Sequence, residues 1–262
     1  HRGTHEVGGS CVEIRTPQAK ILLDLGLPLD FDSRSQEQQE QIRREALEWA
    51  QEADAIFISH YHADHHGLLP DTHRDVAIYA TAGTAAMMHV TEVIHGRGDA
   101  DYLHHINVLS KEADDRKFEP IIVDDIRITP YTVDHAAYDA CAFLIEAEGK
   151  RLFHAGDLNN WHWKDESTPE EVAEAEQNYL KELDDLAKAT DKLDATMFPV
   201  DPRIGTDFMR GAQQFVDHIK TNIFVPMHFW DRPAEVVAFR PYAESRGCRY
   251  ALISVPGEGT DI

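Results

Sequence analysis

Residues 60–66, His-Tyr-His-Ala-Asp-His-His, are the feature that most limits how this chain can fold. They follow directly after residues 55–59, Ala-Ile-Phe-Ile-Ser, whose apolar and β-branched side chains predict a buried strand. Imidazole and carboxylate groups are ligands that borderline divalent metals such as Zn²⁺ take, and a carboxylate can hold two metals side by side. The alternative is a polar loop that is rich in histidine by chance. We expect four side chains to leave this strand end together as metal ligands: His60, His62, Asp64 and His65.

The same pattern, a polar residue just past an apolar strand-like run, recurs three times downstream. The three points are residues 133–135 (Val-Asp-His), 154–157 (His-Ala-Gly-Asp) and 226–228 (Pro-Met-His). A single histidine after a strand is more often a hydrogen-bonded core residue than a ligand. Four such points in one chain, in this order, favour a ligand set over four unrelated core residues.

The rest of the chain alternates runs with strand and helix periodicity. Glycine, proline and capping residues separate these runs, and Thr168-Pro169-Glu170-Glu171 is a clear helix start. The predicted strands are 10–14, 21–25, 55–59, 76–80, 121–123, 126–133, 141–146, 151–154, 195–200, 223–227 and 250–255. The predicted helices are 35–49, 84–94, 168–188 and 207–220. Such a pattern suits an α/β sandwich of two sheets covered by helices.

Composition restricts the class of protein further. With 262 residues and 42% hydrophobic side chains, the chain can form one large α/β domain or two small ones. It has no apolar run long enough for a transmembrane helix and no visible signal peptide, which favours a cytoplasmic location. Its three cysteines, Cys11, Cys141 and Cys248, are far apart and are expected to be small core residues of a reducing compartment.

The net charge of −22 argues against broad nucleic-acid binding, which depends on phosphate neutralisation by lysine and arginine. A small molecule or a short anionic substrate remains compatible with such a charge. Nothing in the sequence indicates the oligomeric state.

The order of these motifs, His-x-His-x-Asp-His, a distant histidine, Gly156-Asp157 and a final histidine, resembles the metallo-β-lactamase superfamily signature. The resemblance implies a single domain over residues 1–262, with the four-layered αβ/βα sandwich of two mixed sheets flanked by helices. It also implies two divalent metal ions, with Zn²⁺ as the default and Mn²⁺ or Fe²⁺ as possible alternatives. The implied ligands are His60, His62 and His135 for one metal, Asp64, His65 and His228 for the other, and Asp157 as the bridge.

Within the superfamily, several segments are similar to the catalytic half of ribonuclease J and β-CASP nucleases. These segments are Gly8-Gly9, residues 21–26 (Ile-Leu-Leu-Asp-Leu-Gly), residues 79–84 and residues 135–139. Those nucleases insert a large domain between the Gly-Asp motif and the final histidine, whereas only residues 158–227 lie there in this chain. The resemblance therefore supports the metal core and does not extend to cleavage of long RNA.

A binuclear site implies a hydrolase in which a metal-bridging hydroxide attacks a phosphoryl or carbonyl centre. Asp64 is expected to orient that hydroxide as well as to bind metal, and His162 is a candidate general acid. Aromatic groups near the metal edge can stack on a base or cover an acyl group. The predicted substrate-binding residues are Trp161, Trp163 and Trp230, together with Tyr138, which could also orient His135.

Phosphoester or phosphodiester hydrolysis is slightly favoured. Hydrolysis of a lactone, β-lactam or thioester by the same hydroxide is the main alternative. A mononuclear iron dioxygenase also shares much of the motif, whereas di-iron oxygen reductases carry Glu where His62 stands. A purely structural metal site is disfavoured, because such sites are usually closed and rich in cysteine.

Overall fold

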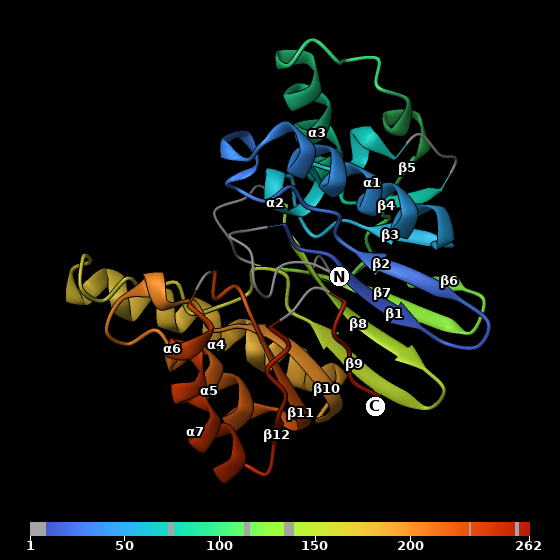
Figure 1. Cartoon of the computed structure of the whole chain (residues 1–262). Coiled ribbons are helices and arrows are strands. Elements are labelled where there is room, and N and C mark those ends of the chain that lie inside the picture. The colour runs from blue at the N-terminus through green and yellow to red at the C-terminus, as the bar shows by residue number, and fades with distance from the viewer. Residues whose placement is uncertain (1–8, 73–75, 113–115, 134–138, 231, 255–256) are drawn as a thin grey trace.

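Two β-sheets lie face to face in the computed structural model, which describes residues 9–72, 76–112, 116–133, 139–230, 232–254 and 257–262 (Figure 1). Within these residues the first sheet has the order β1-β2-β3-β4-β5 and the second β12-β11-β10-β9-β8-β7-β6. The strands of the first sheet are β1 (Val12–Arg15), β2 (Lys20–Leu23), β3 (Ala55–Phe57), β4 (Ala77–Ala80) and β5 (Ile106–Val108). Those of the second are β6 (Ile121–Val123), β7 (Ile126–Thr132), β8 (Cys141–Ala147), β9 (Lys150–His154), β10 (Lys192–Pro199), β11 (Lys220–Met227) and β12 (Arg249–Tyr250).

Both sheets are mixed. In the first, β1 and β2 form an antiparallel hairpin, while β2, β3, β4 and β5 run parallel. In the second, β6 to β9 are antiparallel neighbours, and β9, β10, β11 and β12 run parallel. The helices are α1 (Gln36–Glu52), α2 (Ala63–His66), α3 (Ala82–Ile94), α4 (Pro169–Ala189), α5 (Arg210–His218), α6 (Pro233–Val236) and α7 (Arg240–Ser245).

The buried apolar residues form three clusters separated by the two sheets. The central cluster joins the inner faces of both sheets, for example Ile21 and Leu23 of β2 with Phe143 of β8. Leu22, between them, points to the other side and packs with Ile42 of α1, as the two-residue period of a strand requires. The sheets are therefore buried on both faces, which produces the expected four layers of helix, sheet, sheet and helix.

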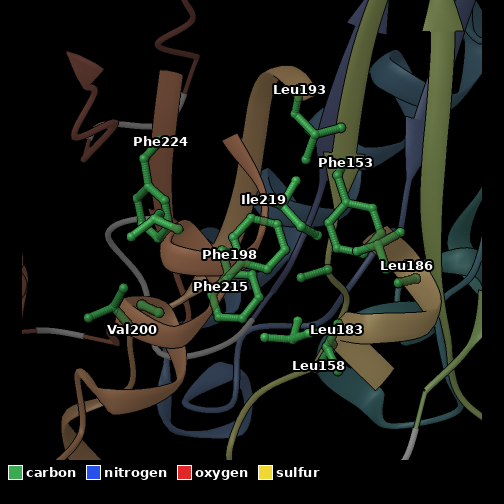
Figure 2. Close-up of a cluster of buried hydrophobic side chains, with 14 of the residues drawn as sticks. Phe153, Leu158, Leu183, Leu186, Leu193, Phe198, Val200, Phe215, Ile219 and Phe224 are labelled. Atoms are coloured by element: carbon green, nitrogen blue, oxygen red, sulfur yellow. The ribbon is translucent and has the colours of Figure 1, made fainter. Parts of the chain in front are cut away.

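The third cluster lies between the second sheet and helices α4, α5 and α7. Figure 2 shows its aromatic centre, where Phe153 of β9, Phe198 of β10 and Phe215 of α5 lie together. The ring centroids of Phe198 and Phe215 are 4.6 Å apart. This packing holds β9, β10 and β11 rigidly against the helices, and these strands end at the edge that carries two of the candidate ligands.

Two predicted helix starts are confirmed in detail. Ser35 and Thr168 each form a capping box, in which the side chain accepts a hydrogen bond from the backbone N–H three residues later. In turn, the side-chain oxygens of Gln38 and Glu171 accept a hydrogen bond from the backbone N–H of Ser35 and of Thr168, respectively. The sequence signals at these positions therefore act locally, as capping chemistry predicts.

Some predicted boundaries are wrong. The last strand stops at Tyr250, because the ladder with β11 pairs only residues 249 and 250. The helix predicted over 207–220 begins at Arg210, after tight turns in which backbone N–H groups reach back only three residues. It ends at His218 because Lys220 already pairs with Lys192 in the sheet. The strand β5 and the short helix α2 were not predicted.

The three cysteines are buried, as expected for small core residues. Among the described residues, no helix has the length and apolar character needed to cross a bilayer.

Candidate metal centre

The ends of three strands bring most of the predicted ligands to one edge of the sandwich. The segment after β3 supplies His60, His62, Asp64 and His65, the turn after β9 supplies Asp157, and His228 follows β11 directly. The seventh predicted ligand, His135, lies outside the described residues. The strand-end pattern in the sequence thus corresponds to a real convergence in space.

His60, His62 and Asp157 form the first group that could hold a metal ion. Nε2 of His60 lies 3.1 Å from Nδ1 of His62 and 3.5 Å from Oδ2 of Asp157. His60 is completely buried and Asp157 is 4% exposed.

Asp64, His65 and His228 form the second group. Nε2 of His65 lies 3.7 Å from Oδ2 of Asp64 and 3.5 Å from Oδ1 of Asp157. Nε2 of His228 is also 3.5 Å from Oδ1 of Asp157. One carboxylate oxygen of Asp157 therefore faces each group, which is the arrangement of a bridging ligand.

These separations suit metal ions. Ligand atoms placed at about 2.0–2.1 Å from a tetrahedral zinc ion lie about 3.3 Å from one another. The nitrogen and oxygen separations given above, 3.1–3.7 Å, are close to that value, and all ligand atoms within each group lie within 4.8 Å of one another. The donor set contains imidazoles and carboxylates without thiolate, so Mn²⁺ and Fe²⁺ are chemically acceptable as well. The residues present fit a pair of divalent ions.

A buried carboxylate, Asp24, fixes the orientation of two of the histidines. Asp24 accepts hydrogen bonds from the backbone N–H of Ser59 (2.7 Å), from the Ser59 hydroxyl (2.9 Å) and from Nδ1 of His65 (2.7 Å). Because the hydroxyl of Ser59 donates to Asp24, its oxygen accepts from Nδ1 of His60 at 3.1 Å. Both imidazoles then carry their proton on Nδ1, which leaves the Nε2 lone pairs facing the metal groups.

A second buried carboxylate, Asp201, fixes the orientation of His228. This completely buried carboxylate, just past β10, accepts a hydrogen bond from Nδ1 of His228 at 2.8 Å. Arg203 donates to Asp201 through Nε (3.0 Å) and Nη2 (2.6 Å), and its guanidinium lies 3.8 Å from the ring centroid of Trp230. Sequence reasoning missed Asp24, Ser59, Asp201 and Arg203.

The backbone is unusual at this edge. Asp24 and His228 both have a φ of 62°, and Trp230 has a φ of 58°. Non-glycine residues rarely adopt this left-handed region, and such conformations cluster at functional sites. Gly26 is required for a different reason, because a Cβ there would lie 1.7 Å from the carbonyl oxygen of Asp64. The Leu-Asp-Leu-Gly segment thus supplies both an orienting carboxylate and room for the ligand loop.

The electrostatics of the protein chain favour a cation at this position. Burial alone would lower the pKa of His65, but Asp24, Asp157 and Asp64 outweigh it and raise that pKa to about 10. Burial likewise opposes protonation of His228, whose pKa is nevertheless raised by Asp157 and Asp201. The carboxylates therefore demand positive charge, which a divalent ion supplies more directly than protons do.

A cavity of about 620 Å³ opens at the ligand groups. The ligands His62, Asp64, Asp157 and His228 line it, and so do residues of α4. The predicted substrate residues Trp161, Trp163 and Trp230 also line it, with Trp161 and Trp163 stacked at a centroid distance of 6.1 Å. The remaining described lining residues are Leu29, Asn159, Glu171, Glu174, Ala175, Asn178, Tyr179, Glu182 and Arg203.

The structure does not bring His162 to this cavity. The residue is 2% exposed, its Nδ1 lies 2.9 Å from the carbonyl oxygen of Asn160, and its Nε2 lies 3.8 Å from Asp207. A buried ring with these contacts cannot reach a leaving group in the cavity, so the predicted role of His162 as general acid does not fit this structure. Tyr138 lies outside the described residues. Asp139, next to it, accepts a hydrogen bond from Gly83 at the start of α3.

Comparisons with known proteins agree with this geometry. The chain is 27% identical over 164 residues to an RNase J-like protein of Methanocaldococcus jannaschii, covering 61% of this chain and 35% of that relative. It is 28% identical over 169 residues to cleavage and polyadenylation specificity factor 73 of Drosophila melanogaster, covering 59% and 23%. The matched region thus spans about a third or less of these relatives' length.

Solved structures share the fold at low sequence identity. Human tRNase Z, short form, superimposes with a TM-score of 0.55 at 12% identity, covering 97% of this chain and 95% of that one. Zn²⁺-bound PqqB from Methylobacterium extorquens gives a TM-score of 0.56 at 16% identity, covering 94% and 86%. A family model described as the beta-lactamase superfamily domain matches residues 21–229. As the ligand motifs predict, the chain belongs to the metallo-β-lactamase superfamily.

Proposed function

We propose that this chain is a metal-dependent hydrolase with two metal ions, and that it acts on a small or short phosphoester, with a phosphodiester favoured. The observation that carries the proposal is Asp157, whose two carboxylate oxygens face two separate ligand groups. Zn²⁺ is the expected ion. When bound, two divalent ions supply an activated water and Lewis-acid stabilisation of the developing negative charge.

The chain's own residues prepare the site for this chemistry. Asp24 and Asp201 hold Nδ1 of His65 and His228, so that the opposite ring nitrogens face the metal groups. Asp64 is 14% exposed and lines the cavity, so its carboxylate can contact the attacking water as well as a metal. Trp161 and Trp230 present ring surface beside the ligands, where they exclude water and can stack on an aromatic part of the substrate.

The relatives that match this chain support phosphodiester chemistry, because several carry nuclease names. They include the RNase J-like protein already described and the endoribonuclease ysh-1 of Neurospora crassa, 29% identical over 180 residues. One structural neighbour is described as a diphosphatase of the PhnP family. Hydrolysis of a lactone, β-lactam or thioester is the rival, since the aromatic wall can also cover an acyl group.

The test is a substrate panel with metal-loaded protein: bis-p-nitrophenyl phosphate, nitrocefin, an acyl lactone and S-lactoylglutathione, with oxygen uptake measured in parallel. We expect turnover of the phosphodiester, about two metals per chain, and a loss of at least about a hundredfold in His62→Ala, since ligand loss exceeds the effect of losing a supporting contact. His89→Ala is the matched control, because His89 is exposed on α3. Unchanged turnover in His62→Ala with both metals bound contradicts the proposal, and turnover of the acyl substrates alone favours the rival.

A further inference from the structure

Arg203 lines the cavity beside His228 and Trp230, within the short 3₁₀ turn Pro202–Ile204 that follows β10. Its guanidinium is held from two sides. Asp201 binds Nε and Nη2, and the face of the group lies on the indole of Trp230. A stacked guanidinium with a carboxylate partner has little freedom left, so any further contact it makes costs little conformational entropy.

The outer edge of this guanidinium is available. Among the residues that the structure describes, Nη1 donates to no hydrogen-bond acceptor, and the side chain is 40% exposed. Two N–H donors at the cavity wall, beside the ligand His228, therefore have no described protein partner. A guanidinium edge of this kind matches the oxygen atoms of a phosphate or carboxylate.

Among the described residues that line the cavity, permanent positive charge is confined to Arg203. Arg203 is the sole Arg or Lys among the described lining residues, whereas five carboxylates line the same cavity: Asp64, Asp157, Glu171, Glu174 and Glu182. Three of these five belong to α4, where Glu171 and Glu174 are exposed and Glu182 is buried and paired with Arg116 at 3.3 Å. An anionic group is therefore attracted towards the metals and Arg203, and repelled from the α4 wall.

We propose that Arg203 binds the anionic group of the substrate, and that the site accepts a single phosphoryl-type anion attached to an uncharged or cationic remainder. This inference rests on the proposed function and narrows it, because two metals would act on both anionic and neutral substrates, although their charge favours an anion. Arg203 discriminates between them, since a guanidinium edge stabilises a charged phosphodiester oxygen more strongly than a neutral carbonyl oxygen.

A pair of substrates with the same leaving group tests this role. For Arg203→Gln we expect kcat/KM for bis-p-nitrophenyl phosphate to fall about tenfold to thirtyfold, as for loss of a partly exposed charge-assisted hydrogen bond. The neutral substrate p-nitrophenyl acetate should change less than threefold. Metal content is measured on the same samples, because a purely structural role in holding Asp201 would reduce metal loading and both activities together.

Binding of inorganic phosphate to the metal-loaded protein provides a readout that needs no turnover. Calorimetry, or intrinsic tryptophan fluorescence, should report a phosphate affinity that is weakened about tenfold or more in Arg203→Gln. Arg210→Gln is the matched control, because Arg210 also forms a two-point ion pair, with Glu176, and is also 40% exposed, yet does not line the cavity. The control should keep wild-type phosphate affinity.

The outcomes separate the two proposals. If wild-type protein hydrolyses neither ester, the proposed function fails while phosphate binding still tests Arg203. The assignment of Arg203 is overturned by equal losses on both esters, by unchanged phosphate affinity in Arg203→Gln, or by absence of phosphate binding to the wild-type protein.

Discussion

Replacing Asp24 with Asn tests whether one buried carboxylate sets the metal-binding state of two histidines. The carboxylate accepts three hydrogen bonds, from the backbone and hydroxyl of Ser59 and from Nδ1 of His65. An asparagine whose oxygen still meets the backbone N–H of Ser59 presents its NH₂ group to His65. The ring must then accept at Nδ1 and carry its proton on Nε2, which faces the metal group.

The size of the effect follows from these contacts. Loss of a hydrogen bond to a charged group costs about 1.5–3 kcal/mol, and removing an orienting partner of a metal-bound histidine typically lowers affinity about 10- to 100-fold. We expect Asp24→Asn to lower the Zn²⁺ affinity of the Asp64–His65–His228 group by an amount within this range. The Zn²⁺ affinity of the group that contains His60 should fall less, because His60 contacts the Ser59 hydroxyl and not Asp24 itself.

The assay is competition for Zn²⁺ with a chromophoric chelator, combined with metal analysis and NMR of histidine tautomers. Asp54→Asn is a suitable control, since Asp54 also accepts a backbone N–H, from Lys20 at 2.8 Å, and is not part of either ligand group. Wild-type affinity for both ions in Asp24→Asn, with the proton of His65 still on Nδ1, would refute the reasoning.

Three further predictions follow from neighbouring contacts. Ser59→Ala should lower the affinity for both metal ions a few-fold in the same chelator competition, because the Ser59 hydroxyl lies 3.1 Å from Nδ1 of both His60 and His65. Burial lowers the pKa of His154 to about 4, so this ring is neutral in the folded state and charged in the unfolded state between pH 4 and 6.5. Acidification through that window should cost about 3 kcal/mol of stability through His154. In urea titrations His154→Asn should reduce the pH dependence by about that amount without abolishing it, because burial also lowers the pKa of His62 and of His66. Glu174→Lys should increase activity on oligonucleotides of several phosphates relative to bis-p-nitrophenyl phosphate, and an unchanged ratio would contradict a repulsive α4 wall.

The strand ends, the capping boxes and the order of ligands were predictable because each depends on local sequence. Apolar runs predicted β3, β9 and β11, and the polar residues just past them are the ones that converge. Short elements were not predictable. The three-residue strand β5 depends on pairing with β4, and the four-residue helix α2 depends on hydrogen bonds within the ligand loop.

Asp24 and Asp201 show where the sequence pattern was applied too narrowly. Each is a polar residue immediately past a buried strand segment, as His60 and His228 are. Both meet the same criterion, but neither lies within a cluster of ligand-type residues in the sequence, so the pattern alone did not indicate a role for them. The role of Arg203 had no sequence signal, because it depends on Trp230, which is 27 positions away in the chain and is brought close only by the pairing of β10 with β11.

The chemistry and the size of the substrate are set by different parts of this cavity. The ligand edge is built from strand ends that the superfamily match covers, so it fixes the kind of reaction. The metal-ligating imidazoles are neutral, so two divalent ions would supply four positive charges against the carboxylates of Asp64 and Asp157, which would favour an anion at that edge. The cavity face of α4 carries the exposed Glu171 and Glu174 without a lysine or arginine of its own lining the cavity, while its Glu182 is buried and paired with Arg116 at 3.3 Å. A further phosphate that extended along this wall would face the carboxylates of Glu171 and Glu174, which lie three residues, about 4.5 Å, apart along the helix axis. Repulsion therefore grows with each added phosphate, and we infer that this wall, rather than the metals, limits the substrate to a short one.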